Sequence, residues 1–226
     1  MRRARLIAVV CLSALGLTGE CMAQSTPAGR YELSAGVRWN GPITVNDAVA
    51  SETAPGGSTS PLFKAHTTLN GSFGATAGFG VRLSRTLRAE MSAAYGTEQL
   101  SSQILADAEV VGATTVRTPV TRVSIEGGIL AQRSRWRARR VQPFATAGVG
   151  YLREMYEGRT LIESGSAIYA GGGLYYVRAS TRTRPGRLEA TGLRVDLRAN
   201  VRRGGVASAT NVHTAPEVMA TLFARF

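Results

Sequence analysis

The chain has 226 residues, of which 19% are charged and 44% hydrophobic, so it is long enough for one sizeable domain and too apolar for a disordered chain. Its 26 glycines follow no G-X-Y period, which excludes collagen, and no run of about 18 apolar residues after the N-terminus predicts a helical membrane bundle. The formal charge is +12, and every basic residue except Lys64 is arginine.

Residues 1–23 have the pattern of a secretory signal peptide. Three arginines among the first five residues precede an apolar stretch over 6–17, and the sequence favours cleavage after Ala23. The alternative is a lipoprotein acylated at Cys21, but Glu20 stands where that signal has a small residue. Cleavage would remove both cysteines, so we expect an exported protein without thiols or disulfides.

After cleavage the chain would keep 24 basic and 14 acidic residues, a net charge of +10. An exported chain does not normally meet nucleic acid, and neither a basic face nor a nucleic-acid-binding module is recognisable. We therefore expect no nucleic-acid partner. The expected domains are a signal peptide (1–23), a short N-terminal segment (24–29) and one β-barrel domain (30–226).

Apolar and polar residues alternate with a period of two along the expected mature chain, which is typical of strands. The clearest case is 193–202, where Leu193, Val195 and Leu197 share one face and Arg194, Asp196 and Arg198 the other. Each segment has about the 9 to 11 residues of a tilted strand that crosses a bilayer. We predict eight strands, at 31–39, 69–83, 87–95, 122–129, 142–153, 166–177, 193–202 and 216–226.

The faces follow from the same alternation. In 69–83, for example, Leu69 and Phe73 are expected on the apolar outer face, whereas the faces of 166–177 stay unassigned because glycines and aromatic residues dominate it. The connections alternate in length. The longer ones, 40–65, 98–112, 157–164 and 203–213, are expected as outer loops, and the shorter ones, 84–86, 133–140 and 180–187, as periplasmic turns. The Pro- and Gly-rich stretch 40–65 is interpreted as a mobile surface loop.

A soluble barrel of lipocalin type would also show eight alternating strands, so the strand count does not decide the compartment. The chain end favours the membrane, because the terminal aromatic Phe226 follows alternating apolar residues. With 142–151 (QPFATAGVGY) and the glycine run 171–173, this end resembles the small eight-stranded outer-membrane barrels of OmpA transmembrane-domain and OmpX type. One departure is Ala224, where a larger apolar residue is common.

The resemblance implies an all-β fold, an eight-stranded antiparallel up-and-down transmembrane β-barrel in the bacterial outer membrane. It also implies that Phe226 is the assembly signal for the outer-membrane barrel assembly machinery, and that outer-membrane lipids surround the barrel. These motifs concern assembly and packing, so they specify architecture better than activity. A structural or surface-interaction role is the expectation, with a lipid A-modifying enzyme and a small-solute pore as alternatives.

Eight strands leave an interior only wide enough for side chains. If the polar faces point inward, arginines and carboxylates share the lumen, where one planar guanidinium bridges two carboxylates. The consequence is a plugged barrel with little conductance. The predicted lumen network comprises Glu32, Arg38, Arg82, Arg88, Glu90, Arg122, Glu126, Arg194, Asp196, Arg198, Arg202, Glu217 and Arg225.

Catalytic chemistry is mostly missing from the pattern. His66 and His213 are expected near the outer rim, but neither stands in a recognised lipid A deacylase motif and no carboxylate is adjacent in sequence to orient either ring. Two histidines without cysteines make a zinc site improbable, and the glycine run 171–173 lacks the lysine and helix of a phosphate loop. We predict no catalytic site, metal or cofactor.

Arginines concentrate in two of the turns expected in the periplasm. They would form a basic collar at the inner leaflet, where each contributes about 1 kcal/mol of attraction to anionic lipid, with Trp136 as an aromatic anchor. Solvated turns are the alternative interpretation. The collar residues are Arg133, Arg135, Arg137, Arg139, Arg140, Arg182, Arg184 and Arg187.

Overall fold

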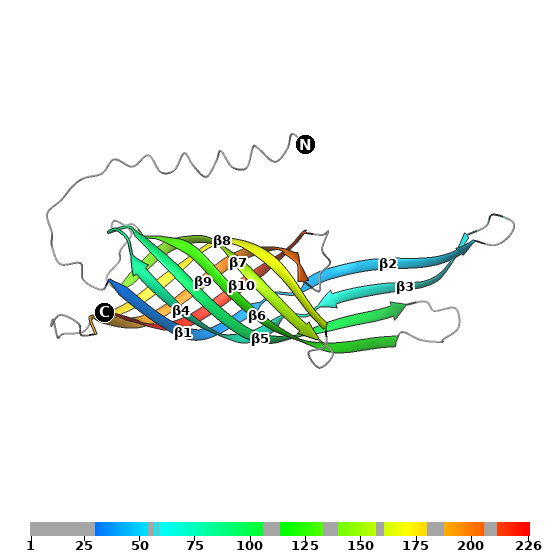
Figure 1. The fold of residues 1–226 in the computed structure, drawn as a ribbon, viewed down its shortest axis with the longest axis horizontal. Helices are drawn as coiled ribbons and strands as arrows, with labels where there is room; N and C mark the ends of the chain where they lie inside the picture. The colour runs from blue at the N-terminus through cyan, green and yellow to red at the C-terminus, as the bar shows by residue number, and fades with distance from the viewer. Residues whose placement is uncertain are drawn as a thin grey trace, which may run out of the picture.

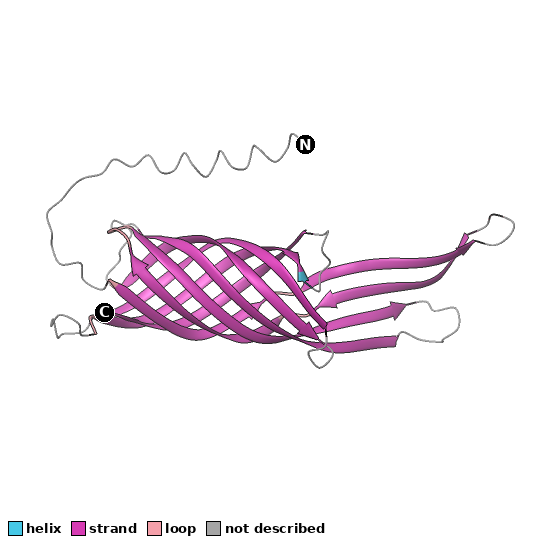
Figure 2. Cartoon of the chain, viewed as in Figure 1, coloured by secondary structure: helices cyan, strands magenta, loops and turns pink. Residues whose placement is uncertain are grey.

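The computed structural model of the chain describes residues 30–53, 57, 59–105, 114–132, 140–156, 161–179, 188–205 and 212–226. Almost all of them lie in strands (Figure 2), and no helix among them is long and apolar enough to cross a membrane. The expected signal peptide and the segment 24–29 lie outside the described residues. The strands are β1 (Tyr31–Asn40), β2 (Ile43–Thr53), β3 (Thr59–Leu69), β4 (Ser72–Arg82), β5 (Leu87–Leu105), β6 (Thr114–Gln132), β7 (Val141–Tyr156), β8 (Leu161–Ala179), β9 (Ala190–Gly204) and β10 (Val212–Arg225).

Eight of these strands close into a ring. β1 pairs with β4 and β10, β4 with β5, β5 with β6, and β6 to β10 follow in chain order, with every pair antiparallel. The strands wind obliquely around a cylinder, and the start of β1 and the C-terminus lie at the same end, which we call the terminal end (Figure 1). The prediction of an eight-stranded antiparallel barrel is confirmed.

The remaining two strands form a hairpin at the other end, which we call the outer end. β2 pairs with β3, and β3 continues onto β5 by pairing Lys64–Leu69 with Leu100–Leu105. Together with the outer parts of β5 and β6, this hairpin projects beyond the ring (Figure 1). The prediction that 40–65 is a loop is therefore wrong over 43–53 and 59–65, which pair as strands, with Pro61 beside a register shift.

The other long connections are also shorter than predicted. β5 extends to Leu105 and β6 begins at Thr114, so most of 98–112 is strand rather than loop, and 157–164 and 203–213 are shortened in the same way. Strand pairing continues past the apolar segments because polar residues also form ladders when water covers their side chains. The short turn 84–86 is confirmed, with the Leu83 amide donating to the Leu87 carbonyl at 3.0 Å.

Two adjacent breaks change which face of the strands is apolar. β1 turns its odd-numbered residues outward, but after Gly41-Pro42 the odd-numbered Ile43 and Val45 of β2 are buried. The same change occurs at Asn70-Gly71, so Leu69 is buried while Phe73 is exposed. The prediction that Leu69 lies on the outer face is wrong, because the alternation does not continue through the break.

The buried apolar side chains form two clusters rather than one core. The outer cluster consists of Ile43, Val45, Leu69, Val120 and Ala215, and it lies where the hairpin leaves the ring. The second cluster, at the terminal end, consists of Leu130, Phe144, Tyr175, Val177 and Phe223. Between these two clusters the lumen is occupied mainly by charged side chains.

Candidate functional site

The lumen is lined by alternate residues of the ring strands. On β9, Arg194, Asp196 and Arg198 are at most 5% exposed, whereas Leu197 between them is 62% exposed on the outer wall. The same alternation on β8 places Tyr169 and Tyr175 inside, which assigns the faces that the sequence left open. Of the predicted lumen residues, eleven are buried; Glu90 has a side chain 13% exposed, and Arg82 is partly buried.

The group nearest the terminal end surrounds Glu32. This carboxylate accepts hydrogen bonds from Arg88, from Arg225 Nε at 2.7 Å and from the Tyr175 hydroxyl at 2.9 Å. The same hydroxyl accepts from Arg194 Nη1 at 3.1 Å, so a phenol links this group to the next one. Strands on opposite sides of the barrel are thereby joined through one carboxylate.

The middle group surrounds three carboxylates. Arg194 binds Asp196 at 2.7 and 2.8 Å and Glu90 at 2.7 Å. Arg198 donates to Asp196 at 3.1 Å and to Glu126 at 3.2 Å. Such forked contacts are the arrangement in which arginine is better suited than lysine.

Arg38 connects the middle group across the barrel. Its two terminal nitrogens bind Glu126 and Glu217, each at 2.5 Å, and its Nε donates to Asn40 at 3.1 Å. Asn200 also donates to Glu217, at 3.0 Å. Glu126 and Glu217 therefore each accept hydrogen bonds from two other strands, β1 and β9.

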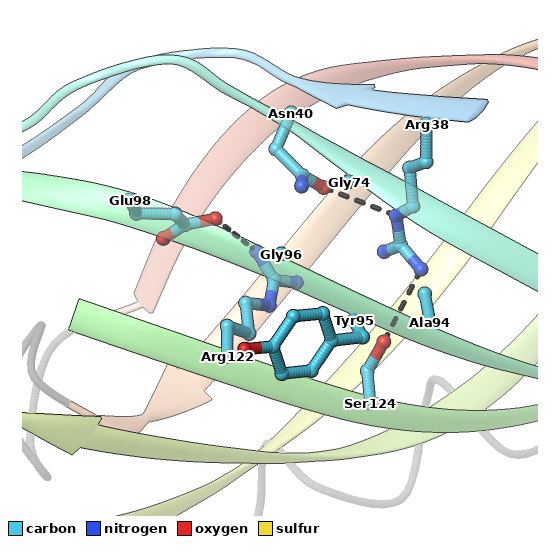
Figure 3. Close-up of a pocket in the computed structure, with 9 residues that line it drawn as sticks. All are labelled: Arg38, Asn40, Gly74, Ala94, Tyr95, Gly96, Glu98, Arg122 and Ser124. Carbon is cyan, nitrogen blue, oxygen red and sulfur yellow. Dashed lines mark hydrogen bonds and ion pairs between the residues drawn. The ribbon is translucent and has the colours of Figure 1, made fainter.

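The outer group contains two carboxylates that sequence reasoning missed. Glu98 accepts from Arg122 at 2.8 Å and from Ser72 at 3.2 Å, and Glu154 accepts from Arg202 at 3.3 Å (Figure 3 shows Glu98 and Arg122). Glu98 was assigned to a loop, and Glu154 follows the last residue of the predicted strand 142–153. Continuing the two-residue alternation past the apolar segments would have found both.

The described lumen is electrically balanced. Seven guanidinium groups and seven carboxylates fill it: Arg38, Arg88, Arg122, Arg194, Arg198, Arg202 and Arg225 against Glu32, Glu90, Glu98, Glu126, Glu154, Asp196 and Glu217. Isolated buried charges would be very costly, but here each one has an opposite charge within 4 Å. The positive net charge of the chain therefore comes from residues outside this network.

Aromatic rings close the lumen at the terminal end. Tyr175 packs against Phe144 and Phe223 at centroid distances of 4.9 and 5.0 Å, and Arg225 lies 4.6 Å above the Tyr175 ring. Arg194 likewise lies 4.8 Å from the Phe144 ring, so two arginines pack against this cluster. Aromatic and charged side chains thus pack together at this end.

Glycines provide the room for large lumen side chains. A Cβ atom on Gly148 would lie 2.6 Å from Cζ of Tyr169, and one on Gly173 would lie 2.6 Å from Cζ of Phe144. Gly127, in contrast, faces open space on the outer wall. At these two positions glycine leaves space inside the barrel for an aromatic side chain.

Two small cavities lie in the described lumen. One of about 10 Å³ is lined by Arg38, Glu98, Arg122 and Ser124 (Figure 3), and one of about 30 Å³ by Glu32, Glu90, Arg194 and Thr221 among others. Volumes of this size hold about one or two water molecules. Neither cavity has room for a larger solute.

The outer wall carries an apolar band. On β7 the outward residues run from Val141 through Val149 to Tyr151, a rise of about 25 Å for a tilted strand, and Arg153 follows. Aromatic residues stand near both edges of the band. Tyr31, Phe79, Tyr176 and Phe226 lie toward the terminal end, and Phe73, Tyr95 and Tyr151 toward the outer end.

Phe226 lies at the edge of this band that faces the terminal end. Its side chain is 38% exposed, and its backbone exchanges hydrogen bonds with Tyr31, at 2.9 and 3.1 Å. The last residue of the chain is thus held against the first strand of the barrel.

Basic residues are exposed just beyond the band at the terminal end. Arg30, Arg85, Arg140 and Arg178 are all exposed, and Arg140 donates to the Tyr176 hydroxyl at 3.3 Å, a bond that raises the pKa of Arg140. Of the predicted collar, only Arg140 is among the described residues. The others, Arg133, Arg135, Arg137, Arg139, Arg182, Arg184 and Arg187, lie outside them, as does Trp136.

His66 and His213 both lie toward the outer end, as the sequence suggested, with His213 on β10 opposite Arg202 of β9. His66 lies on β3, in the projecting hairpin, and its Nδ1 contacts the carboxylate of Asp47 on β2. The expectation that no carboxylate orients either ring is therefore wrong for His66, because strand pairing brings together two residues 19 positions apart. Among the described residues no cluster of three or more His, Cys, Asp or Glu side chains could hold a metal ion.

The fold and the lumen together define a class of protein: a small closed β-barrel with an apolar outer wall and a neutral ionic interior. Neither a model of a known protein family nor a curated protein matches the sequence. Solved structures do. The outer membrane protein OprG from Pseudomonas aeruginosa is 14% identical, with 88% of this chain and 96% of that chain covered and a TM-score of 0.48.

Two further solved structures are similar. Neisserial surface protein A is 14% identical over 88% of this chain and 99% of that chain, with a TM-score of 0.46. Ail, the attachment invasion locus protein of Yersinia pestis, is 12% identical over 88% of this chain and 100% of that chain, with a TM-score of 0.43, in a complex with the heparin analogue sucrose octasulfate. These are small outer-membrane β-barrel proteins, and the likeness is one of fold.

Proposed function

We propose that the protein is an integral outer-membrane β-barrel with a structural or surface-interaction role and a lumen closed to solutes. The observation that carries the proposal is the reversed polarity of the barrel: charges fill the inside and apolar side chains cover the outside. A soluble barrel in water would be stable with the opposite arrangement. In a bilayer the apolar wall is favoured, whereas each arginine on it would cost about 2 to 4 kcal/mol at mid-depth.

The experiment for this proposal is fractionation followed by gel mobility. The chain is expected in the outer-membrane fraction, beginning at Gln24 if the signal peptide is cleaved after Ala23. A folded barrel migrates differently before and after boiling, so a heat-dependent shift is expected. A soluble chain, or one whose mobility does not change on boiling, would overturn the proposal.

The closed lumen argues against the pore alternative. Apolar clusters stand at both ends, the ionic groups between them are paired, and the cavities are no larger than about 30 Å³. We expect no stable conductance in planar bilayers. Discrete, long-lived channel openings from the purified, folded protein would favour the small-solute pore.

A surface role is supported by the sheet that projects from the outer end. β2, β3 and the outer parts of β5 and β6 form it, and exposed polar side chains such as Lys64, Arg117 and Glu52 lie along it. β2 has one strand partner, β3, so its other edge is a candidate for strand addition by a partner. Binding that disappears when this hairpin is shortened would support the role.

The enzyme alternative rests on one observation, the contact between Asp47 and His66. A histidine held by an aspartate supplies two of the three members of a Ser–His–Asp catalytic triad. The hydrogen bonds of His66 to described residues include no serine hydroxyl, which is why we do not prefer this function. Lipid A modified by the native protein, but by neither Asp47→Asn nor His66→Ala, would establish the enzyme.

We further propose that the terminal end binds anionic phospholipid headgroups of the inner leaflet and that Phe226 is recognised by the barrel assembly machinery. Arg30, Arg85, Arg140 and Arg178 support the first proposal by their exposure below the apolar band. Replacing Arg85, Arg140 and Arg178 by glutamine should reduce the anionic phospholipid that copurifies, most visibly at low salt. Unchanged lipid content would indicate that these arginines are merely solvated and do not bind lipid.

A further inference from the structure

The outer wall is hollowed at one place that neither the lumen nor the apolar band explains. The hollow is shallow and wide open to the outside; it spans β7, β8 and β9, and its lining is Tyr151, Ser164, Gly165, Ser166, Arg203 and Gly204. Gly165 and Gly204 are register partners, and Gly204 has a φ of +83°, which favours glycine. At Gly165 and Gly204 the lining of the hollow is therefore backbone.

The hollow lies at the edge of the apolar band that faces the outer end. Below it on the same strands the outward residues are apolar, namely Val149 on β7, Ile168 on β8 and Val201 on β9. At the hollow they become serine and arginine. In the outer-membrane barrel proposed above, this edge lies at the headgroups of the outer leaflet, and the apolar residues beneath it lie against acyl chains.

Positive charge stands on both sides of the hollow. Arg203 is part of the lining, and Arg153 is exposed on β7 opposite Ser164. The two arginines flank β8, and two strand spacings with a short axial offset place their Cα atoms about 10 to 12 Å apart. Two extended guanidinium groups at that separation reach the same anion.

The nearest carboxylates on these strands are engaged elsewhere. Glu154 is buried in the lumen with Arg202, and Glu163 accepts a hydrogen bond from the Tyr156 hydroxyl at 3.0 Å. Hydroxyl donors complete the hollow. Ser164 Oγ accepts a hydrogen bond from the Tyr151 hydroxyl at 2.7 Å, so the Ser164 hydroxyl can still donate one to a ligand. Ser166 is exposed on the same strand.

We propose that this hollow binds a phosphate group of an outer-leaflet phosphorylated glycolipid. Arg203 and Arg153 hold the phosphate by charge-assisted hydrogen bonds, the serine hydroxyls add donors, and the apolar wall below takes the acyl chains. A lipid fits better than a free anion, because the site lies directly beside the apolar outer wall, against which acyl chains can pack. The inference rests on the proposed outer-membrane function.

The test measures binding of diphosphoryl lipid A to the full, folded chain in detergent, with lipid A stripped of phosphate as the comparison. Arg153→Gln combined with Arg203→Gln should weaken binding about tenfold or more, as lost charge-assisted bonds predict. The matched control, Lys64→Gln with Arg117→Gln, removes the same charge from the projecting sheet and should bind as the native protein does. Dephosphorylated lipid A should bind as weakly to the native protein as the intact lipid binds to the double variant.

Three results would overturn the inference. They are native affinity in the Arg153 and Arg203 double variant, equal binding of the dephosphorylated lipid, and complete displacement by inorganic phosphate, which would make the hollow a free-anion site. Gel mobility before and after boiling is measured for every variant. A heat-shifting barrel in the outer membrane without the expected phosphate dependence refutes only this inference, whereas absence from that membrane refutes the proposed function.

Discussion

Arg194 and Asp196 point into the lumen from the same face of β9, and the guanidinium donates two hydrogen bonds to the carboxylate, from Nε at 2.7 Å and from Nη2 at 2.8 Å. Asp196 also accepts from Arg198 at 3.1 Å, so one carboxylate bridges two successive arginines of a single strand, and Glu90 and Glu126 bind the same arginines from other strands. This relationship explains how arginines at 194 and 198 are stable inside a narrow barrel. It also makes Asp196 a position at which the network can be tested.

Replacing Asp196 by asparagine should destabilise the barrel by about 3 to 5 kcal/mol, because it leaves buried guanidinium groups without their counter-charge. The measurement is urea unfolding in detergent or liposomes, followed by the gel shift. Glu52→Gln is the matched control, since Glu52 is exposed on the projecting hairpin and its loss should be nearly neutral. Equal stability of both variants would contradict the importance of the network.

Gly148→Ala should destabilise the barrel by about 1 to 3 kcal/mol, because the added methyl group meets the backbone carbonyl of Gly127 and the Tyr169 side chain and forces them apart. Gly127→Ala is the matched control on the neighbouring strand, where the methyl group faces open space on the outer wall. The difference between the two unfolding free energies is the quantity to compare. If Gly127→Ala proves as harmful as Gly148→Ala, backbone flexibility rather than lumen space explains the glycines.

Leu197→Arg should hinder membrane insertion and cost about 2 to 4 kcal/mol, because Leu197 faces outward in the middle of the apolar band. Val212→Arg is a control of equal exposure, with Val212 63% and Leu197 62% exposed, but it lies beyond the band on β10. Yield in the outer-membrane fraction and unfolding free energy are measured together. Equal effects at the two positions would show that the band is not the lipid-facing surface.

Shortening the projecting hairpin should leave the barrel intact. Replacing 48–65 by Asn-Gly, which favours a tight hairpin turn, keeps the buried Ile43, Val45 and Leu69 of the outer cluster. Since the ring closes without β2 and β3, the heat-dependent gel shift should persist. Loss of that shift would mean that the hairpin is part of the folding unit rather than an appended surface.

Much of the barrel could be predicted from the alternation of residues. Leu193 to Arg202 shows why: a strand between lipid and a polar lumen must change polarity at every residue, so the pattern records both strand and face. The alternation did not predict strands outside the bilayer, where no lipid requires an apolar outer face. Beyond the bilayer neither face of a strand has to be apolar, so 40–65 and 98–112, which contain β2, most of β3 and the outer part of β5, showed no regular apolar face and were predicted as loops.

The candidate site, too, could be predicted only in part from the sequence. Alternation placed Arg38, Glu126 and Glu217 on polar faces, but only the closed ring brings residues 88 and 179 positions from Arg38 within reach of its guanidinium group. Glu98 and Glu154 were missed because they lie past the apolar segments, although their positions continue the alternation. The contact of Asp47 with His66 depends on hairpin register, which no local pattern in the sequence specifies.

The sequence by itself determined the strand period, the polarity of the barrel and most of the charged residues that enter the lumen, because these depend on the contrast between lipid and polar surroundings at successive residues. Only the tertiary structure decided which charges pair, where apolar caps close the lumen, and where the outer wall is hollowed. Those features depend on ring closure, on register and on the two breaks at Gly41-Pro42 and Asn70-Gly71. They arise from contacts between residues far apart in the chain, which a two-residue period does not encode.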